Sequence, residues 1–390
     1  MSATLSPALT ERTFDRYAEL IQDLTFPSVR RWKDENRRPA IAYFPVYAPL
    51  ELIHACGMLP VGLHGAGDQL DLQHADARFG SFICSVVKTT LEMGMTGHLD
   101  LFDGLLFSSI CDSARNLAFV MKRNFPEKYV EFLHLPHNPA SPASADFLCA
   151  EYVRLREGLE TLGGKKADGA ALAHSIALYN EGRQLMRELY RFRSENPHRL
   201  PTSELYAVVR AGDFLPVEEH NACLAQALAQ AVRNQGRPRD SVRVVVEGSF
   251  CEQPPLQLIK LVEQAGCYVV DDDFILGPRW FTEDVPASGD PLRALAESYL
   301  NRSVYSSVRH DARKPRHKEL IAKVRRNRAQ AVILLIAKFC EPAYFDYVLY
   351  KRELEAAGIP HLLVEFEEKM FTFERPQNEV ETFVESLLFD

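Results

Sequence analysis

The chain has 390 residues, of which 46% are hydrophobic, and carries a formal net charge of -8 with a pI near 5.9. This length and apolar content can bury more than one core and predict two or three domains. The acidic balance disfavours nucleic-acid binding, because the densest basic run, residues 309–328, lacks the interleaved aromatic residues that stack on bases. We interpret that run as a solvated helix face and loop, with a docking patch for an acidic partner as the alternative.

No targeting segment or membrane span is predicted. The start, MSATLSPALTERTFDRY, has no apolar core after a basic end, and no stretch reaches the roughly 18 to 20 apolar residues that cross a bilayer. The 8 cysteines are too widely spaced for the disulfide framework of a small secreted domain. We therefore expect a soluble, cytoplasmic protein with reduced thiols and with no membrane or nucleic-acid partner.

The first predicted unit is AIAYFPVYAPLELIHACGMLPVGLHG, residues 40–65. An apolar strand leads into a helix that starts after a proline and carries Leu50, Leu52 and Ile53 on one side. Gly57 is a typical stop signal, and a second short strand follows. The pattern is that of a strand–helix–strand unit.

Two cysteines follow at the boundaries of predicted elements. Cys84 lies in a helix-compatible stretch that opens after Gly80, and a helix N-terminus stabilises a thiolate. Cys111 ends the apolar run DGLLFSSIC, after which a helix-sized interval leads to the strand VEFLHLP. Both thiols are therefore placed where a ligand can reach them.

The second half of the chain repeats this order. A proline-rich stretch at residues 135–147 and a polar one at 233–241 bound a mainly helical region. Residues 242–274 then read as strand, helix after Pro254 and Pro255, and strand. The run QAVILLIAKFC ends at Cys340, and another helix-sized interval leads to the strand HLLVEFE.

Near-continuous apolar strands that alternate with helices are typical of parallel sheets covered on both faces. We therefore predict an α/β fold with two related, doubly wound, mainly parallel-sheet domains and a helical segment between them. The expected domains are an N-terminal helix with the first α/β domain at 1–145, a helical linking region at 146–240, and the second α/β domain at 241–390.

The cysteines are the candidates for chemistry. In open α/β sheets ligands bind beyond the carboxyl ends of the strands, so Cys111 and Cys340 are expected to face a shared cleft. Cys84 is the third candidate metal ligand. Taken singly, each of them fits a small buried hydrophobic residue better than a metal ligand. Cys56 and Cys251 are reserve candidates, and the remaining three are interpreted as buried residues without a metal: Cys149, Cys223 and Cys267.

Other chemistries find less support. The sequence has no G-x-x-x-x-G-K-[ST] phosphate loop, no G-x-G-x-x-G after a strand, and neither H-E-x-x-H nor G-x-S-x-G. The triplet Asp271–Asp273 caps a following helix, meets solvent or, as the alternative, holds Mg²⁺. His54 is interpreted as a helix residue with satisfied hydrogen bonds. From the residues alone, the prediction is a two-domain α/β protein with a thiolate metal site.

Four motifs, in order, resemble those of the benzoyl-CoA reductase and 2-hydroxyacyl-CoA dehydratase family. They are PLELIHACGMLP (P-x-E-x-x-x-A-x-G-x-x-P), the helix start ICSVVKTTLE, ICDSARNL (C-D-x-x-R-x-L) and KFCEP (F-C-[DE]-P). The likeness extends from about Ile41 to the C-terminus. It implies two α/β domains with an iron–sulfur cluster between them, held by Cys84, Cys111 and Cys340, with one iron lacking a protein thiolate. The cluster is either a single 4Fe-4S cubane or a larger, bridged one.

Within the family, EGSFCEQPPLQLIK, GCYVVDDDF and PVEEHN look most like the small cluster-binding subunits, of B or C type, of ATP-dependent benzoyl-CoA reductase. The resemblance implies dearomatising ring reduction of an aromatic acyl-CoA in anaerobic aromatic degradation. It implies as partners a homologous sister subunit, ATP-hydrolysing electron-activating subunits and ferredoxin as the upstream donor. Two alternatives stay open: a subunit of a 2-hydroxyacyl-CoA dehydratase, and a non-catalytic iron–sulfur or acyl-CoA binding protein.

Overall fold

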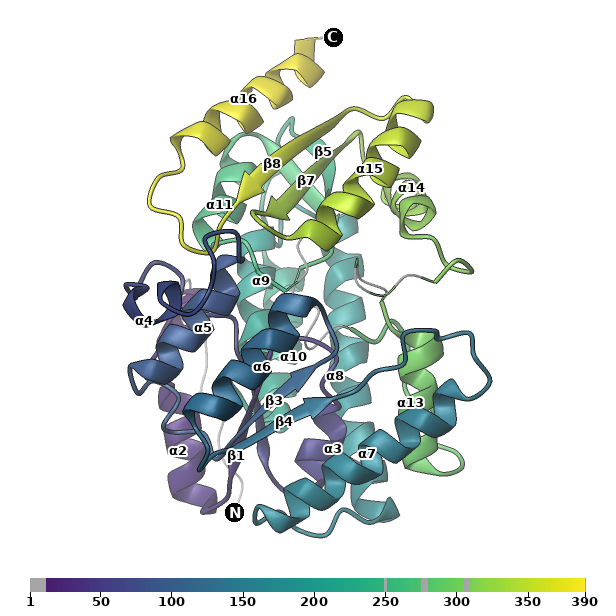
Figure 1. The fold of residues 1–390 in the computed structure, drawn as a ribbon. Coiled ribbons are helices and arrows are strands. Elements are labelled where there is room, and N and C mark those ends of the chain that lie inside the picture. The colour runs from purple at the N-terminus through teal and green to yellow at the C-terminus, as the bar shows by residue number, and fades with distance from the viewer. Residues whose placement is uncertain are drawn as a thin grey trace.

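The structure is a computed structural model that describes residues 12–248, 251–274, 280–304, 307, 309 and 311–389. The first eleven residues of the predicted first domain lie outside this range, as do residues 249–250 of the second strand–helix–strand unit. Figure 1 shows two sheets with helices packed around them, the first in the lower part of the view and the second in the upper part.

The first sheet has four parallel strands in the order β2-β1-β3-β4. Every residue of β1, β2 and β3 is buried, which explains why the sequence of each strand is almost continuously apolar. The strands are β1 (Ala40–Tyr43), β2 (Leu59–Gly62), β3 (Gly104–Ser108) and β4 (Tyr129–Leu133).

The second sheet repeats this arrangement, with four parallel strands in the order β6-β5-β7-β8. In both sheets the chain reverses its winding between the first and third strands in sequence, and such switch points are where open α/β sheets bind ligands. The predicted fold class is confirmed. The strands are β5 (Val242–Glu247), β6 (Cys267–Asp272), β7 (Ala331–Ala337) and β8 (His361–Phe366).

Helices cover the sheets and fill the region between them, as Figure 1 shows. Those of the first half are α1 (Arg12–Leu20), α2 (Pro27–Asn36), α3 (Leu50–Ala55), α4 (Gln73–Asp76), α5 (Ser85–Met95) and α6 (Asp112–Asn124). The central helices are α7 (Ser144–Thr161), α8 (Gly169–Glu195), α9 (Thr202–Arg210), the short 3-10 turn η1 (Ala211–Asp213) and α10 (Val217–Arg233). Those of the second half are α11 (Leu256–Gln264), α13 (Pro291–Arg302), α14 (Arg316–Arg326), α15 (Glu341–Ala356) and α16 (Glu374–Phe389).

The long helix α8 ties the two halves together, because it packs against both α3 and β6. Its buried Arg183 forms an ion pair with Glu51 on α3. Its buried Arg193 forms another with Asp272 at the end of β6, at 2.5 Å. A guanidinium that is removed from water needs such a partner, so these pairs fix α8 against each half. The domain boundaries at residues 145 and 240 stay predictions.

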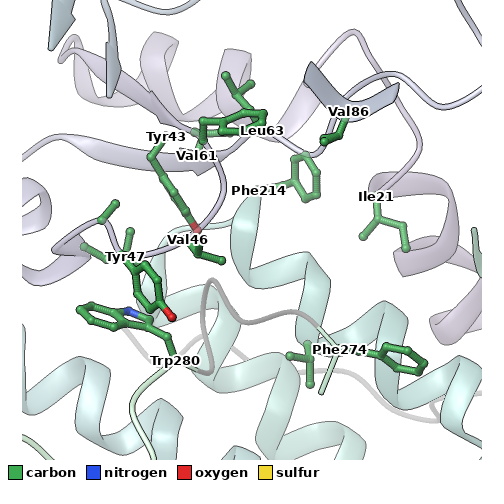
Figure 2. Close-up of a cluster of buried hydrophobic side chains, with 14 of the residues drawn as sticks. Ile21, Tyr43, Val46, Tyr47, Val61, Leu63, Val86, Phe214, Phe274 and Trp280 are labelled. Atoms are coloured by element: carbon green, nitrogen blue, oxygen red, sulfur yellow. The ribbon is translucent and has the colours of Figure 1, made fainter. Parts of the chain in front are cut away.

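One hydrophobic core runs through both halves of the molecule, and a smaller one lies under α14 and α15. Figure 2 shows a part of the larger core in which residues from distant segments meet. There the ring of Tyr47, after β1, packs edge-on against Trp280 with 5.7 Å between centroids. The halves are therefore joined by apolar contacts as well as by ion pairs.

Two expectations need correction. The helix that carries Cys84 begins at Ser85 rather than just after Gly80, since residues 81–84 form turns and bends. The basic run 309–328 is only partly a solvated surface: Arg316 and Lys323 are mostly buried and contact Glu247 at 2.9 and 2.7 Å. The sequence pattern could not show this, because Glu247 belongs to β5. None of the described helices is long and apolar enough to cross a membrane.

Candidate metal centre

A cavity of about 580 Å³ lies at the carboxyl ends of β3 and β7, between the two halves of the chain. Four cysteines line it: Cys84, Cys111, Cys251 and Cys340. The expectation that Cys111 and Cys340 face one shared cleft is therefore met by the geometry. Metal binding by these thiols stays a prediction.

Cys111 occupies the N-cap of α6, three residues after the end of β3. Its backbone is extended, with φ -145° and ψ 175°, as is typical of a residue that precedes the first helical turn. Burial raises the pKa of its thiol, while the amides of Ser113 and Ala114 oppose that rise. The thiol therefore lies at the positive end of the helix dipole.

Cys340 holds the equivalent position in the second half, at the N-cap of α15 and three residues after β7. Burial raises the pKa of its thiol to about 12, against the effect of the Ala343 amide. The residue before it, Phe339, has a φ of 65°, in the left-handed region that aromatic residues rarely adopt. Backbone strain of this kind is concentrated at functional sites.

Cys84 is the third N-cap, at the start of α5. Burial raises the pKa of its thiol well above the usual value, and the nearby Glu252, Cys111 and Cys340 add to the effect. The amide of Val87 acts in the opposite direction. The start of this helix therefore faces the same cavity as the starts of α6 and α15.

These three helix starts form a donor set suited to an iron–sulfur cluster. The amides of the first helical turns act on the three sulfur atoms, which carry negative charge once metal replaces their protons. Within the described ranges, no group of three or more His, Cys, Asp or Glu side chains could hold a metal ion. A cluster differs from a single ion because each thiolate binds its own iron, so thiols spread around one cavity match its needs.

Glu252 closes the cavity beside Cys84 and was not foreseen from the sequence. Its carboxylate accepts hydrogen bonds from the Ser85 hydroxyl at 2.5 Å, the Glu368 amide at 2.6 Å and the Val86 amide at 3.3 Å. Burial raises its pKa, and these hydrogen bonds oppose the rise. No local pattern signals this role, because Glu252 and Ser85 are 167 residues apart.

Phenylalanine side chains surround the mouth of the cavity. Phe82 is 71% exposed, Phe345 is 73% exposed and Phe339 is 40% exposed. Three large exposed rings around one opening form a surface typical of an interaction site. No pattern in the sequence distinguishes these three phenylalanines from buried aromatic residues.

The other candidates lie elsewhere. The reserve candidate Cys56 does not line the cavity, and neither do Cys149, Cys223 and Cys267. Of the last three, which were interpreted as buried, Cys267 is buried, whereas Cys149 and Cys223 are half-buried. The His54 side chain contacts Ser175 at 3.0 Å and Glu218 at 3.4 Å.

In the acidic triplet, Asp272 pairs with Arg193, and Asp273 accepts a hydrogen bond from the Gly248 amide at 2.8 Å. These carboxylates are engaged by protein groups, which argues against the magnesium alternative.

Comparison with known proteins finds a matching family and several relatives over nearly the whole chain. Residues 45–387 match the family described as 2-hydroxyglutaryl-CoA dehydratase, D-component. The chain is 40% identical to the C-type subunit of the benzoyl-CoA reductase of Thauera aromatica, over 95% of this chain and 97% of the relative. It is 32% identical to the lactoyl-CoA dehydratase subunit beta of Anaerotignum propionicum, over 91% and 94% of the two chains. It is also 27% identical to the (R)-2-hydroxyglutaryl-CoA dehydratase subunit beta of Acidaminococcus fermentans, over 92% and 94%.

Proposed function

Because this chain belongs to the 2-hydroxyglutaryl-CoA dehydratase D-component family, we propose that it is a subunit of an ATP-dependent benzoyl-CoA reductase. The observation that carries the proposal is the 40% identity to the C-type subunit of a benzoyl-CoA reductase across nearly the whole of both chains. The reaction adds two electrons and two protons to the aromatic ring of benzoyl-CoA and leaves a cyclohexadienoyl-CoA with its thioester intact. Such a step belongs to anaerobic degradation of aromatic compounds.

Cys84, Cys111 and Cys340 are the residues proposed to hold the iron–sulfur cluster. Support comes from their shared cavity and from their common position at helix N-caps. When bound, the cluster supplies one-electron transfer at low potential. The proposed cluster has four irons, with a larger, bridged cluster as the alternative.

The surroundings of the three cysteines suit this chemistry. The amides of Val87, Ser113, Ala114 and Ala343 lie where they stabilise negative charge on the ligating sulfurs, which is one way that a protein tunes a cluster. The Phe44 and Phe132 side chains add apolar surface to the cavity wall. Exclusion of water from a radical intermediate limits side reactions, so an apolar wall is an advantage here.

The aromatic mouth supports a multi-subunit enzyme. Phe82, Phe339 and Phe345 are proposed to be covered by a homologous sister subunit, so that the thiols of this chain lie close to the acyl-CoA substrate. ATP-hydrolysing subunits, themselves reduced by ferredoxin, are proposed to deliver the electrons. This sequence has no phosphate-loop motif, which agrees with ATP hydrolysis by other subunits. Reduced thiols and a ferredoxin donor go with a cytoplasmic location.

A subunit of a 2-hydroxyacyl-CoA dehydratase is the second candidate. It is supported by the 32% and 27% identities to dehydratase beta subunits, which also extend over almost the full length. In that reaction the substrate receives one electron and returns it to the enzyme after water has left. The same thiol site is therefore suited to both reactions. A non-catalytic acyl-CoA or iron–sulfur binding protein is the third.

One assay separates these candidates. The chain is purified without oxygen together with its sister subunit and the ATPase subunits, and is given benzoyl-CoA or a 2-hydroxyacyl-CoA with ATP and a strong reductant. Ring-reduced product from benzoyl-CoA supports the proposal. If the only product is an enoyl-CoA formed from the hydroxyacyl substrate, the protein is a dehydratase subunit instead. If the complex contains the cluster but converts neither substrate, the protein is a non-catalytic binding protein.

A further inference from the structure

A second cavity, of about 230 Å³, lies between the two halves of the chain. Two consecutive residues separate it from the cysteine-lined cavity, because Glu252 lines that cavity and Gln253 lines the second one. Its wall comes from segments that are far apart in the sequence, namely 21–24, 65–69, 253–257 and 368–373, together with Arg210 at the end of α9. The fold itself therefore builds this cavity.

Arg210 is the cationic side chain of the second cavity. Its guanidinium donates a hydrogen bond to the Tyr206 hydroxyl at 2.9 Å and lies over the Tyr206 ring, 5.7 Å from the ring centroid. Among the described residues, the buried Nε of Arg210 has no hydrogen-bond acceptor, and no carboxylate lies within ion-pair distance of the guanidinium. A half-buried charge without a counter-ion is costly, so this side chain is suited to an anionic ligand.

The groups beside Arg210 favour an anion as well. Glu368 lines the cavity and accepts a hydrogen bond from the Thr89 hydroxyl at 3.0 Å. Burial raises the pKa of Glu368 to about 8, so at pH 7 its carboxyl is mostly neutral and does not cancel the charge of Arg210. Asp68 also lines the cavity, but it is exposed, and water screens its charge. The start of α11, whose N-cap makes no side-chain hydrogen bond, adds positive potential.

Much of the remaining wall is apolar. Ile21 and Leu256 are buried, and Leu24, Met370 and Phe373 are half-buried. A dry apolar cavity of about 150 Å³ holds one benzene molecule, so a cavity of about 230 Å³ has room for such a ring and a carboxylate. An inorganic anion leaves this apolar surface uncovered, whereas an acid with an apolar body covers it.

We propose that the second cavity binds a small carboxylic acid with an apolar body. Its carboxylate pairs with Arg210, and its body packs against Ile21, Met370 and Phe373. The site is separate from the cysteine-lined cavity, so it does not depend on the proposed function. Because both halves of the chain contribute to the wall, the bound acid stabilises the folded protein by mass action.

Binding of benzoate to the anaerobically purified chain tests the inference, because benzoate has the required charge and a body of fitting size. Titration calorimetry is expected to show saturable binding in the millimolar range or tighter. Benzamide has the same ring without the charge, and phosphate has the charge without an apolar body. Both are expected to bind at least about tenfold more weakly. No saturable binding of benzoate up to about 10 mM, or equal binding of benzamide, overturns the inference.

Matched variants and hydrogen exchange locate the site. Arg210→Gln is expected to weaken benzoate binding at least about tenfold. Arg38 is also half-buried and lines neither cavity, so Arg38→Gln should bind benzoate like the wild type. In the wild type, which removes any dependence on the folding of the variants, benzoate is expected to slow amide exchange in residues 65–69 and 368–373. Unchanged affinity of a folded Arg210→Gln, or slower exchange only around the cysteine-lined cavity, overturns the inference.

Discussion

The Glu252 carboxylate accepts a hydrogen bond from the Ser85 hydroxyl at 2.5 Å, and this contact joins the two halves of the protein beside the cavity that the four cysteines line. Ser85 begins the helix that Cys84 caps, and Glu252 follows Cys251 in the chain. The amides of Val86 and Glu368 donate to the same carboxylate. A single side chain thus fixes the relative position of two of the four thiols.

Glu252→Ala is expected to lower the free energy of unfolding by about 3 kcal/mol, because it leaves two buried donors and one half-buried donor without an acceptor. Glu252→Gln retains one acceptor oxygen and is expected to lose only about 1 kcal/mol. Urea denaturation of the purified chain measures both. A loss below about 1 kcal/mol for the alanine variant means that solvent replaces these hydrogen bonds and that Glu252 does not hold the halves together.

Cys84→Ala, Cys111→Ala and Cys340→Ala are each expected to reduce iron and sulfide from about four per chain to less than one, because two remaining N-cap thiolates hold a cluster poorly. Cys149→Ala and Cys223→Ala remove thiols outside the cavity and serve as controls. They are expected to retain their iron, with a loss of stability of about 1 kcal/mol. Iron analysis after anaerobic purification decides, and full iron in Cys111→Ala or Cys340→Ala refutes the shared site.

Glu368→Gln is expected to change how stability depends on pH. Burial and the neighbouring Glu252 raise the pKa of Glu368 from 4.5 to about 8, so the folded chain keeps a proton that the unfolded chain has lost. Wild-type stability therefore falls as pH rises from about 5 to 8, by roughly 1 kcal/mol per pH unit from this group. The neutral glutamine lacks this contribution, so the stability of the variant relative to the wild type should increase across that range.

Urea denaturation at several pH values between about 5 and 8 measures the difference between the two proteins. Asp273, whose pKa is also raised to about 8, contributes the same slope to both and cancels. Parallel stability curves for the wild type and Glu368→Gln show that Glu368 is ionised in the folded chain.

Arg316→Ala is expected to destabilise the protein by about 3 kcal/mol. The buried guanidinium lies 2.9 Å from Glu247, 3.3 Å from Asp346 and 3.5 Å from Asp273, and its removal takes a counter-charge from these carboxylates, although Glu247 keeps Lys323 at 2.7 Å. Arg325 belongs to the same basic run but is exposed, so Arg325→Ala should change the free energy of unfolding by less than about 0.5 kcal/mol. Similar effects of the two substitutions in thermal unfolding contradict a structural role for the buried part of the run.

Phe345→Ser is expected to weaken binding of the sister subunit at least about tenfold, because it removes an exposed aromatic ring from the mouth of the cavity. Phe371→Ser is the matched control, since Phe371 is 71% exposed but does not line the cavity. Titration calorimetry with the sister subunit gives both affinities, and iron content should stay unchanged. If the two variants bind equally well, the sister subunit docks elsewhere.

The sequence by itself determined the elements of the fold and the three N-cap cysteines. Strand β7 is a continuous apolar run, and Cys340 comes between that run and a proline at the second position of α15. These signals are local, because burial and helix capping depend on a residue and its immediate neighbours. The start of α5 was the exception, since residues 81–84 are compatible with a helix but form turns before it.

Only the tertiary structure decided which thiols meet and which charges are buried. Cys251 joins Cys340 because β5 lies beside β7, and the order of strands in a parallel sheet depends on contacts between segments far apart in the chain. The Glu252–Ser85 hydrogen bond and the burial of Arg316 against Glu247 have the same origin. Periodicity records which face of an element is apolar but not which other element covers that face, so these contacts have no signature in the sequence.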